Sequence, residues 1–180
     1  EKPEKREPQL EVIINESDRL SNLIKNMLDL SKLQPSKLHF EPTVFNLSDS
    51  VCQMISRYDI FENQGYVFHA DIMPDIMITG DKDRINQAIC NLIDNAVNHS
   101  VKNKEIFISL IKNDDILFKV TNFGDVIEKE HLPHIWDRYY KVDKVGNRRV
   151  TGTGIGLSIV KEILLSHNFK FGVSSDAENG

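Results

Sequence analysis

The stretch that most constrains this chain is residues 81–100, which end in the sequence NLIDNAVNHS. Apolar residues recur there at steps of three and four, the spacing of a helix with one face turned to a core. These apolar positions are Ile85, Ala88, Ile89, Leu92 and Ala96. The stretch is therefore predicted to be an amphipathic helix that packs on a core.

A second face of the same predicted helix carries Asn91, Asp94, Asn95 and Asn98. Short amide side chains compete for backbone hydrogen bonds and are poor helix formers, so this row runs against propensity. Neutral amide oxygens can ligate Mg²⁺. In proteins this ion usually keeps several water ligands and binds one or two protein oxygens together with phosphate oxygens of the substrate. The row indicates either such a cation site or an ordinary solvated helix face.

Composition narrows the class of protein. The 180 residues are 40% hydrophobic and 27% charged, which allows one buried domain and an appendage. The net charge of −5 and the lack of a Lys/Arg tract argue against a nucleic-acid partner. Apolar runs such as 106–111 are far shorter than the roughly 20 residues of a membrane helix. Cys52 and Cys90 fit neither a disulfide framework nor a CxxC site, which favours a reducing cytoplasm.

A wide apolar stripe predicts a long helix over residues 8–34, ended by Pro35. Because a Pro-Ser-Lys break follows it, we interpret this helix as an arm that packs against another helix or subunit. A core helix of the same domain would show the same stripe.

The remaining predicted elements are strands at 43–46, 66–70 and 76–79, a helix at 47–63, a hairpin of 105–112 with 116–121, and a final strand at 169–174. Residues 122–152 show little periodicity apart from a helix-like piece near 131–139. So long an irregular segment is usually functional, and we interpret it as a lid.

The stretch Gly152-Thr153-Gly154-Ile155-Gly156-Leu157 opens the next predicted helix, which runs to about His167. Closely spaced glycines let backbone N–H groups approach an anion, and a helix N-terminus adds partial positive charge. The stretch therefore predicts a phosphate site, although tight connectors use similar glycines. Its GxGxG spacing, with no strand leading into it, differs from a dinucleotide fingerprint.

Four stretches in this order resemble the N box, first glycine box, F box and second glycine box of the sensor histidine kinases of two-component systems: NLIDNAVNHS, TNFGDVI, IWDRYYKVD and GTGIGLSIVKEIL. The resemblance implies an α/β (α+β) fold, a two-layer sandwich of a mixed sheet and helices, preceded by one long helix. Residues 1–35 would be the second helix of the dimerisation and phosphotransfer hairpin, and residues 36–180 the catalytic ATP-binding domain.

The resemblance also implies roles for single residues. Asn95 would be the Mg²⁺ ligand and Asn91 its catalytic neighbour, while Lys141 would supply a cation near the phosphates. The residues implied to contact ATP are Asn95, Asn98, His99, Asn122, Gly124, Ile127, Tyr140, Lys141, Gly152, Thr153, Gly154, Ile155, Gly156 and Leu157. Tyr140 as a core aromatic and Lys141 as a solvated cation remain alternative interpretations.

The implied function is transfer of the γ-phosphoryl group of Mg-ATP to a histidine of the dimerisation domain, for relay to a response regulator. The full-length protein would be a homodimer anchored in the cell membrane, with this part in the cytoplasm. None of the six histidines has the neighbours of the family's acceptor histidine, so we expect the acceptor to lie outside this chain. We also expect the last strand of the domain to lie outside it. Asn91 stands where relatives in the wider superfamily have a water-activating glutamate, so transfer rather than efficient hydrolysis is predicted.

The first glycine box departs from the family pattern. Asn122 replaces an aspartate and Val126 a glycine. A neutral hydrogen bond to adenine is typically about half as strong as a charge-assisted one, which predicts weaker ATP binding. A degenerate, non-catalytic module that binds nucleotide or a partner is the alternative.

Overall fold

The computed structural model describes residue 17 and residues 41–100, 103–142 and 153–176. The chain divides into two units, Glu1–Leu38 and His39–Gly180. The helix predicted over residues 8–34 lies outside the described residues except for Ser17, which is helical. Apart from Ser17, the residues that the structure describes all belong to the second unit.

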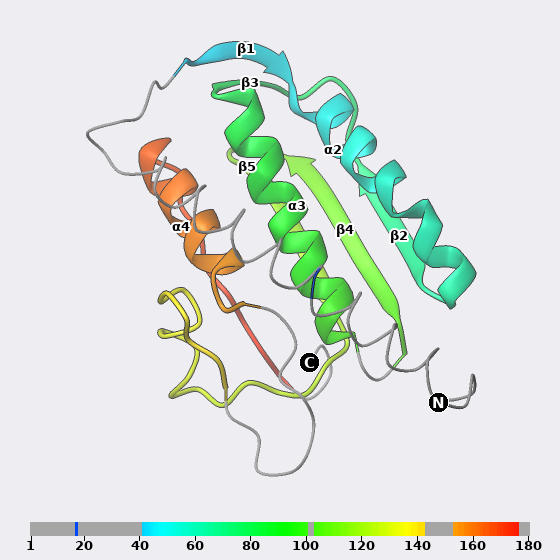
Figure 1. Ribbon diagram of the computed structural model, residues 1–180. Coiled ribbons are helices and arrows are strands. Elements are labelled where there is room, and N and C mark those ends of the chain that lie inside the picture. Colours follow the sequence, from blue (N-terminus) through cyan, green and yellow to red (C-terminus); the bar gives the residue numbers. More distant parts are fainter. Residues whose placement is uncertain (1–16, 18–40, 101–102, 143–152, 177–180) are drawn as a thin grey trace. The chain divides into compact units, whose positions relative to one another are not determined.

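The helices and strands of this unit are shown in Figure 1. They are β1 (Thr43–Asn46), α2 (Leu47–Ile55), the 3-10 helix η2 (Ser56–Gln64), β2 (Val67–Ile72), β3 (Met77–Gly80), α3 (Lys82–His99), β4 (Glu105–Lys112), β5 (Ile116–Asn122) and α4 (Gly156–Ser166). No helix among the described residues combines the length and hydropathy that crossing a bilayer would require.

The strands form two sheets. The larger has the order β2-β4-β5, in which β4 runs parallel to β2 and antiparallel to β5. The smaller pairs β1 with β3, from Thr43 opposite Gly80 to Asn46 opposite Met77. In Figure 1, α2 and α3 lie over the larger sheet and α4 packs beside α3, which confirms the predicted sandwich of helices on a mixed sheet.

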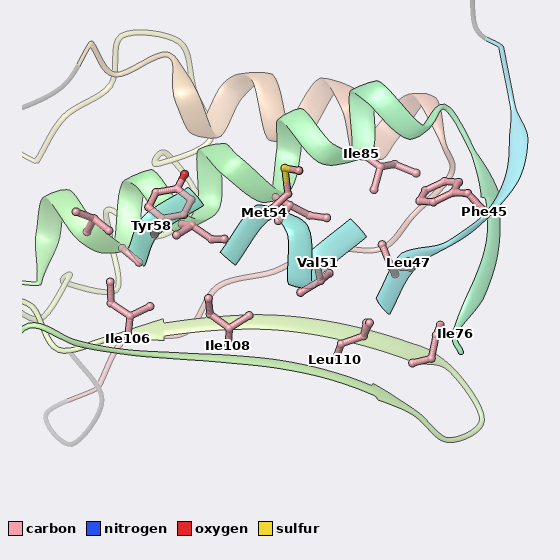
Figure 2. Close-up of a cluster of buried hydrophobic side chains, with 14 residues drawn as sticks. Phe45, Leu47, Val51, Met54, Tyr58, Ile76, Ile85, Ile106, Ile108 and Leu110 are labelled. Atoms are coloured by element: carbon pink, nitrogen blue, oxygen red, sulfur yellow. The ribbon is translucent and has the colours of Figure 1, made fainter. Parts of the chain in front are cut away.

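The core lies between the helices and the larger sheet. Ile106, Ile108 and Leu110 point from β4 toward the helices, and each is at most 1% exposed (Figure 2). Val51 of α2 and Ile93 of α3 meet them and are fully buried. Burying a large aliphatic side chain contributes about 1.5–3 kcal/mol, so this cluster dominates the packing energy.

Local signals fix where the helices start. The Asn46 side chain accepts a hydrogen bond from Asp49 N at 3.2 Å, and the Asp81 side chain accepts one from Arg84 N at 3.1 Å. These are N-caps, which satisfy donors left free at a helix start. At the far end of α4, His167 Nε2 accepts the backbone N–H of Asp81 at 3.0 Å. The end of α4 is thereby joined to the start of α3.

Two predicted elements and part of the predicted core were wrong. Residues 169–176 contain no strand, since within the described residues they pair with no neighbouring strand. Side chains hold this segment instead, with Phe171 against Trp136 at 4.9 Å between ring centroids. Residues 131–139 form hydrogen-bonded turns and no helix. On α3, Leu92 is only half-buried, whereas Ile93 and Val97, which were not assigned to the core, are buried.

Candidate functional site

The polar face of α3 forms the first wall of the candidate site. Asn91 and Asn95 are half-buried, while Asn98 and His99 are exposed. The amide of Asn91 faces the start of α4, because a Cβ at Gly156 would lie 3.6 Å from Asn91 Oδ1. Its Nδ2 is buried and has no hydrogen-bond partner among the described residues. Buried donors are rarely left unpaired, so this amide is suited to a ligand that enters between α3 and α4.

The start of α4 is suited to an anion. Its N-cap residue is Ile155, whose buried apolar side chain cannot accept hydrogen bonds from the first turn. The first turn also contains no acidic residue. A helix that starts this way presents backbone N–H groups and the positive end of its dipole. Half-buried Thr153 and Gly154 lead into it, and Gly152 lies outside the described residues.

The end of β5 brings the first glycine box against α3. A Cβ at Gly124 would lie 2.7 Å from the carbonyl oxygen of His99 and 3.3 Å from Asn122 Nδ2. Only glycine permits this approach without a shift of the backbone. Asn122 is half-buried, and the backbone N–H of Ile127 donates to Ser175 Oγ at 2.9 Å. The segment that follows β5 therefore lies close to α3 at Gly124 and is hydrogen-bonded to Ser175 at Ile127.

The F box contacts the second glycine box through its backbone. The N–H of Tyr139 donates to the carbonyl oxygen of Gly154 at 2.8 Å. Both residues adopt positive φ, 64° for Tyr139 and 71° for Gly154. This conformation is costly for tyrosine, and such strain clusters at functional sites. Tyr140 and Lys141, the next two residues, are half-buried.

Side chains add further links between the F box and α4. Arg138 lies 3.5 Å from Glu162, and Asp137 lies 3.8 Å from Lys161. All four side chains are at least one-third exposed, so each ion pair contributes little alone. Together with the Tyr139 hydrogen bond, they fix the position of the F box along α4.

Tyr58 is a supporting residue that the sequence did not identify. Its hydroxyl donates to Asp94 Oδ1 at 2.7 Å and lies 3.2 Å from the carbonyl oxygen of Cys90. Burial raises the pKa of Tyr58, and the Asp94 carboxylate raises it further, so the hydroxyl keeps its proton. Burial likewise raises the pKa of the Cys90 thiol. Tyr58 thus ties η2 to α3 one residue before Asn95, a contact that no local spacing predicts.

The described residues of the four sequence stretches thus approach one another in the fold. Asn91 meets Gly156, Gly124 meets His99, and Tyr139 meets Gly154. The N box, both glycine boxes and the F box therefore border one region at the C-terminal half of α3.

Comparison with known proteins shows which family the chain resembles. Residues 80–180 match the family described as histidine kinase-, DNA gyrase B-, and HSP90-like ATPase. Sensor histidine kinase CusS of Escherichia coli O6:H1 is 29% identical over 91% of this chain and 34% of its own length. Sensor histidine kinase WalK of Bacillus subtilis is 29% identical over 88% of this chain and 26% of its own. The chain thus spans about a third or less of these relatives.

Solved structures resemble the fold. The catalytic domain of histidine kinase ThkA is 25% identical with a TM-score of 0.61, and the match covers 71% of this chain and 83% of that one. ThkA in complex with response regulator protein TrrA gives a TM-score of 0.78 at 21% identity, covering 99% of this chain and 50% of that one.

Proposed function

This chain belongs to the histidine kinase-, DNA gyrase B- and HSP90-like ATPase family, and we propose that it binds Mg-ATP and transfers the γ-phosphoryl group to a histidine outside these residues. The observation that carries the proposal is the meeting of Asn91 with the start of α4 at Gly156. An amide row and an N-terminal helix turn that face each other suit a cation and its phosphates together.

The residues present fit these groups. The amide oxygen of Asn95 would hold Mg²⁺, which supplies charge neutralisation to the phosphates when bound. Backbone N–H groups of Gly154–Gly156 would receive the triphosphate, and Lys141 would add a cation beside it. Asn91 carries no titratable proton acceptor, so it positions groups and does not activate water. Phosphoryl transfer depends mainly on such positioning and charge stabilisation.

The nucleoside would lie between α3 and the first glycine box. The amide oxygen of Asn122 would accept a hydrogen bond from the adenine amino group. Gly124 lets the segment after β5 approach the end of α3 without a clash. Asn98, His99, Ile127 and Tyr140 would line the remaining edge, beside Leu157 of α4. The exposed side chains of Asn98 and His99 suit contact with a ligand rather than packing.

The whole protein would act in a two-component system. Residues 1–35 would be one helix of a dimerisation hairpin, residues 36–180 the catalytic domain, and a response regulator the final acceptor. The names of CusS, WalK and ThkA, all histidine kinases, support this assignment, as does the ThkA–TrrA complex. The full-length protein would be a homodimer anchored in the membrane.

Mixing the chain with Mg-ATP and a separate hairpin that carries the acceptor histidine tests the proposal. We expect acid-labile, alkali-stable phosphohistidine on the hairpin. Asn95→Ala should abolish it, while Asn63→Ala, at an exposed asparagine of η2, should leave it unchanged. A wild-type chain that binds Mg-ATP but leaves the hairpin unlabelled would show that it is not a kinase. Rapid ATP hydrolysis lost in Asn91→Ala would instead refute the assignment of Asn91.

A further inference from the structure

Three side chains of types that can ligate a metal lie together outside the set of residues proposed to contact ATP. Glu128, Glu130 and His131 each offer one ligand atom, and these atoms all lie within 4.8 Å of one another. A backbone turn creates the cluster, since the N–H of His131 donates to the carbonyl oxygen of Glu128 at 2.9 Å. The turn brings residues three apart in sequence to the same side.

The imidazole of His131 is already oriented by a neighbour outside the cluster. Its Nδ1 lies 2.7 Å from the hydroxyl of Tyr140, while its Nε2 lies 3.8 Å from Glu130 Oε1. Histidines that ligate metals nearly always use one ring nitrogen for the metal and hydrogen-bond the other. With Nδ1 bonded to Tyr140, Nε2 is the nitrogen that faces the carboxylates.

We propose that Glu128, Glu130 and His131 bind a divalent transition-metal ion of the Zn²⁺ class. Zinc bonds of roughly 2.0–2.2 Å in tetrahedral geometry put neighbouring ligand atoms about 3.4 Å apart. Both glutamates are exposed, so their side chains can close the small remaining gap. One imidazole with two carboxylates suits Zn²⁺, whereas Mg²⁺ and Ca²⁺ prefer oxygen ligands alone. Solvent would fill the fourth position.

The site does not depend on the proposed kinase activity, because its test needs no nucleotide. Tyr140 is the residue common to both regions. When Nε2 ligates the metal, Nδ1–H donates to the Tyr140 hydroxyl, and this bond fixes the orientation of both rings. A bound ion would therefore hold Tyr140 in place at the end of the F box.

Titration of the full chain with zinc chloride in a calorimeter, in buffer free of chelators, tests the site. We expect one Zn²⁺ per chain, and a fall in affinity of at least about tenfold in His131→Gln and in Glu130→Gln. Glu128→Gln, an isosteric change at an exposed position, should give the same loss. Tyr140→Phe removes the orienting hydroxyl and should weaken binding by about tenfold.

His69→Gln is the matched control. His69 Nε2 also lies 3.8 Å from a carboxylate, that of Glu105, but within the described part of the chain this pair has no third ligand. Zn²⁺ affinity should therefore be unchanged in this variant and in His134→Gln. The proposal is overturned if the wild-type chain takes up no Zn²⁺, or if uptake persists in Glu128→Gln/Glu130→Gln. Loss of uptake in either control would also overturn it.

Discussion

Replacing Gly124 with alanine tests how closely the first glycine box approaches α3. The added Cβ would lie 2.7 Å from the His99 carbonyl oxygen, 0.7 Å inside the 3.4 Å at which ordinary van der Waals contact begins. The obstructing atom belongs to the backbone at the end of α3, so no side chain can rotate away. Overpacking of this kind typically costs about 1–3 kcal/mol of unfolding free energy.

Urea unfolding of wild type and Gly124→Ala measures this cost directly. Because relief of the clash moves Asn122 away from α3, we also expect nucleotide affinity to fall by about tenfold, equivalent to roughly 1.4 kcal/mol. Gly172→Ala is the control, since a Cβ there meets nothing within 4 Å and its φ is not positive. It should change stability by less than about 0.5 kcal/mol. Equal stability of the Gly124 and Gly172 variants would refute the close approach.

Three further changes probe neighbouring contacts. Tyr58→Phe removes the hydrogen bond to Asp94 and should cost about 1–2 kcal/mol at neutral pH. The pKa of Tyr58 is higher in the folded than in the unfolded state. The contribution of Tyr58 to stability is therefore fully present below the unfolded-state pKa of about 10, and it is lost as the pH rises above that value toward the folded-state pKa. The stability difference between wild type and variant should therefore shrink in alkaline urea melts, and a constant difference would contradict this. Gly154→Ala forces alanine to φ 71° and should cost roughly 1–2 kcal/mol of unfolding free energy. In Gly156→Ala the added Cβ meets its nearest atom at 3.6 Å, so this variant should fold normally. A lower melting temperature for Gly156→Ala than for Gly154→Ala would be inconsistent with the structure. Asn122→Asp should strengthen ATP binding by about 1 kcal/mol, roughly fivefold, through a charge-assisted bond, and identical affinity in a titration would make the adenine assignment wrong.

The extent of α3 was predictable because its signals are local. Asp81 caps the first turn, and the predicted apolar spacing continues to Ala96. Which side chains of α3 are fully buried was not predictable, because this depends on the elements that pack against the helix. Helices α2 and α4 and the sheet all contact α3, so its buried surface is wider than one stripe and includes Ile93.

The segments that were predicted wrongly depend on distant partners. The segment from Phe169 to Ser174 has the alternating composition of a strand. A strand forms only where a neighbouring strand supplies the partners for its backbone hydrogen bonds. Residues 131–139 carry helix-like spacing, yet contacts such as Trp136 with Phe171 favour turns instead. Likewise, sequence suggested which stretches border the site, but the Tyr58–Asp94 and Tyr139–Gly154 contacts arise only from the fold.

Both ends of α4 lie against α3: His167 accepts a hydrogen bond from the backbone N–H of Asp81, and Gly156 lies beside Asn91. The eleven-residue helix therefore acts as a spacer whose length matches the ten-residue step from Asp81 to Asn91. Inserting one residue would add about 1.5 Å and rotate everything beyond it by about 100°. An insertion or deletion within α4 would therefore take either the glycine turn or the histidine anchor out of register.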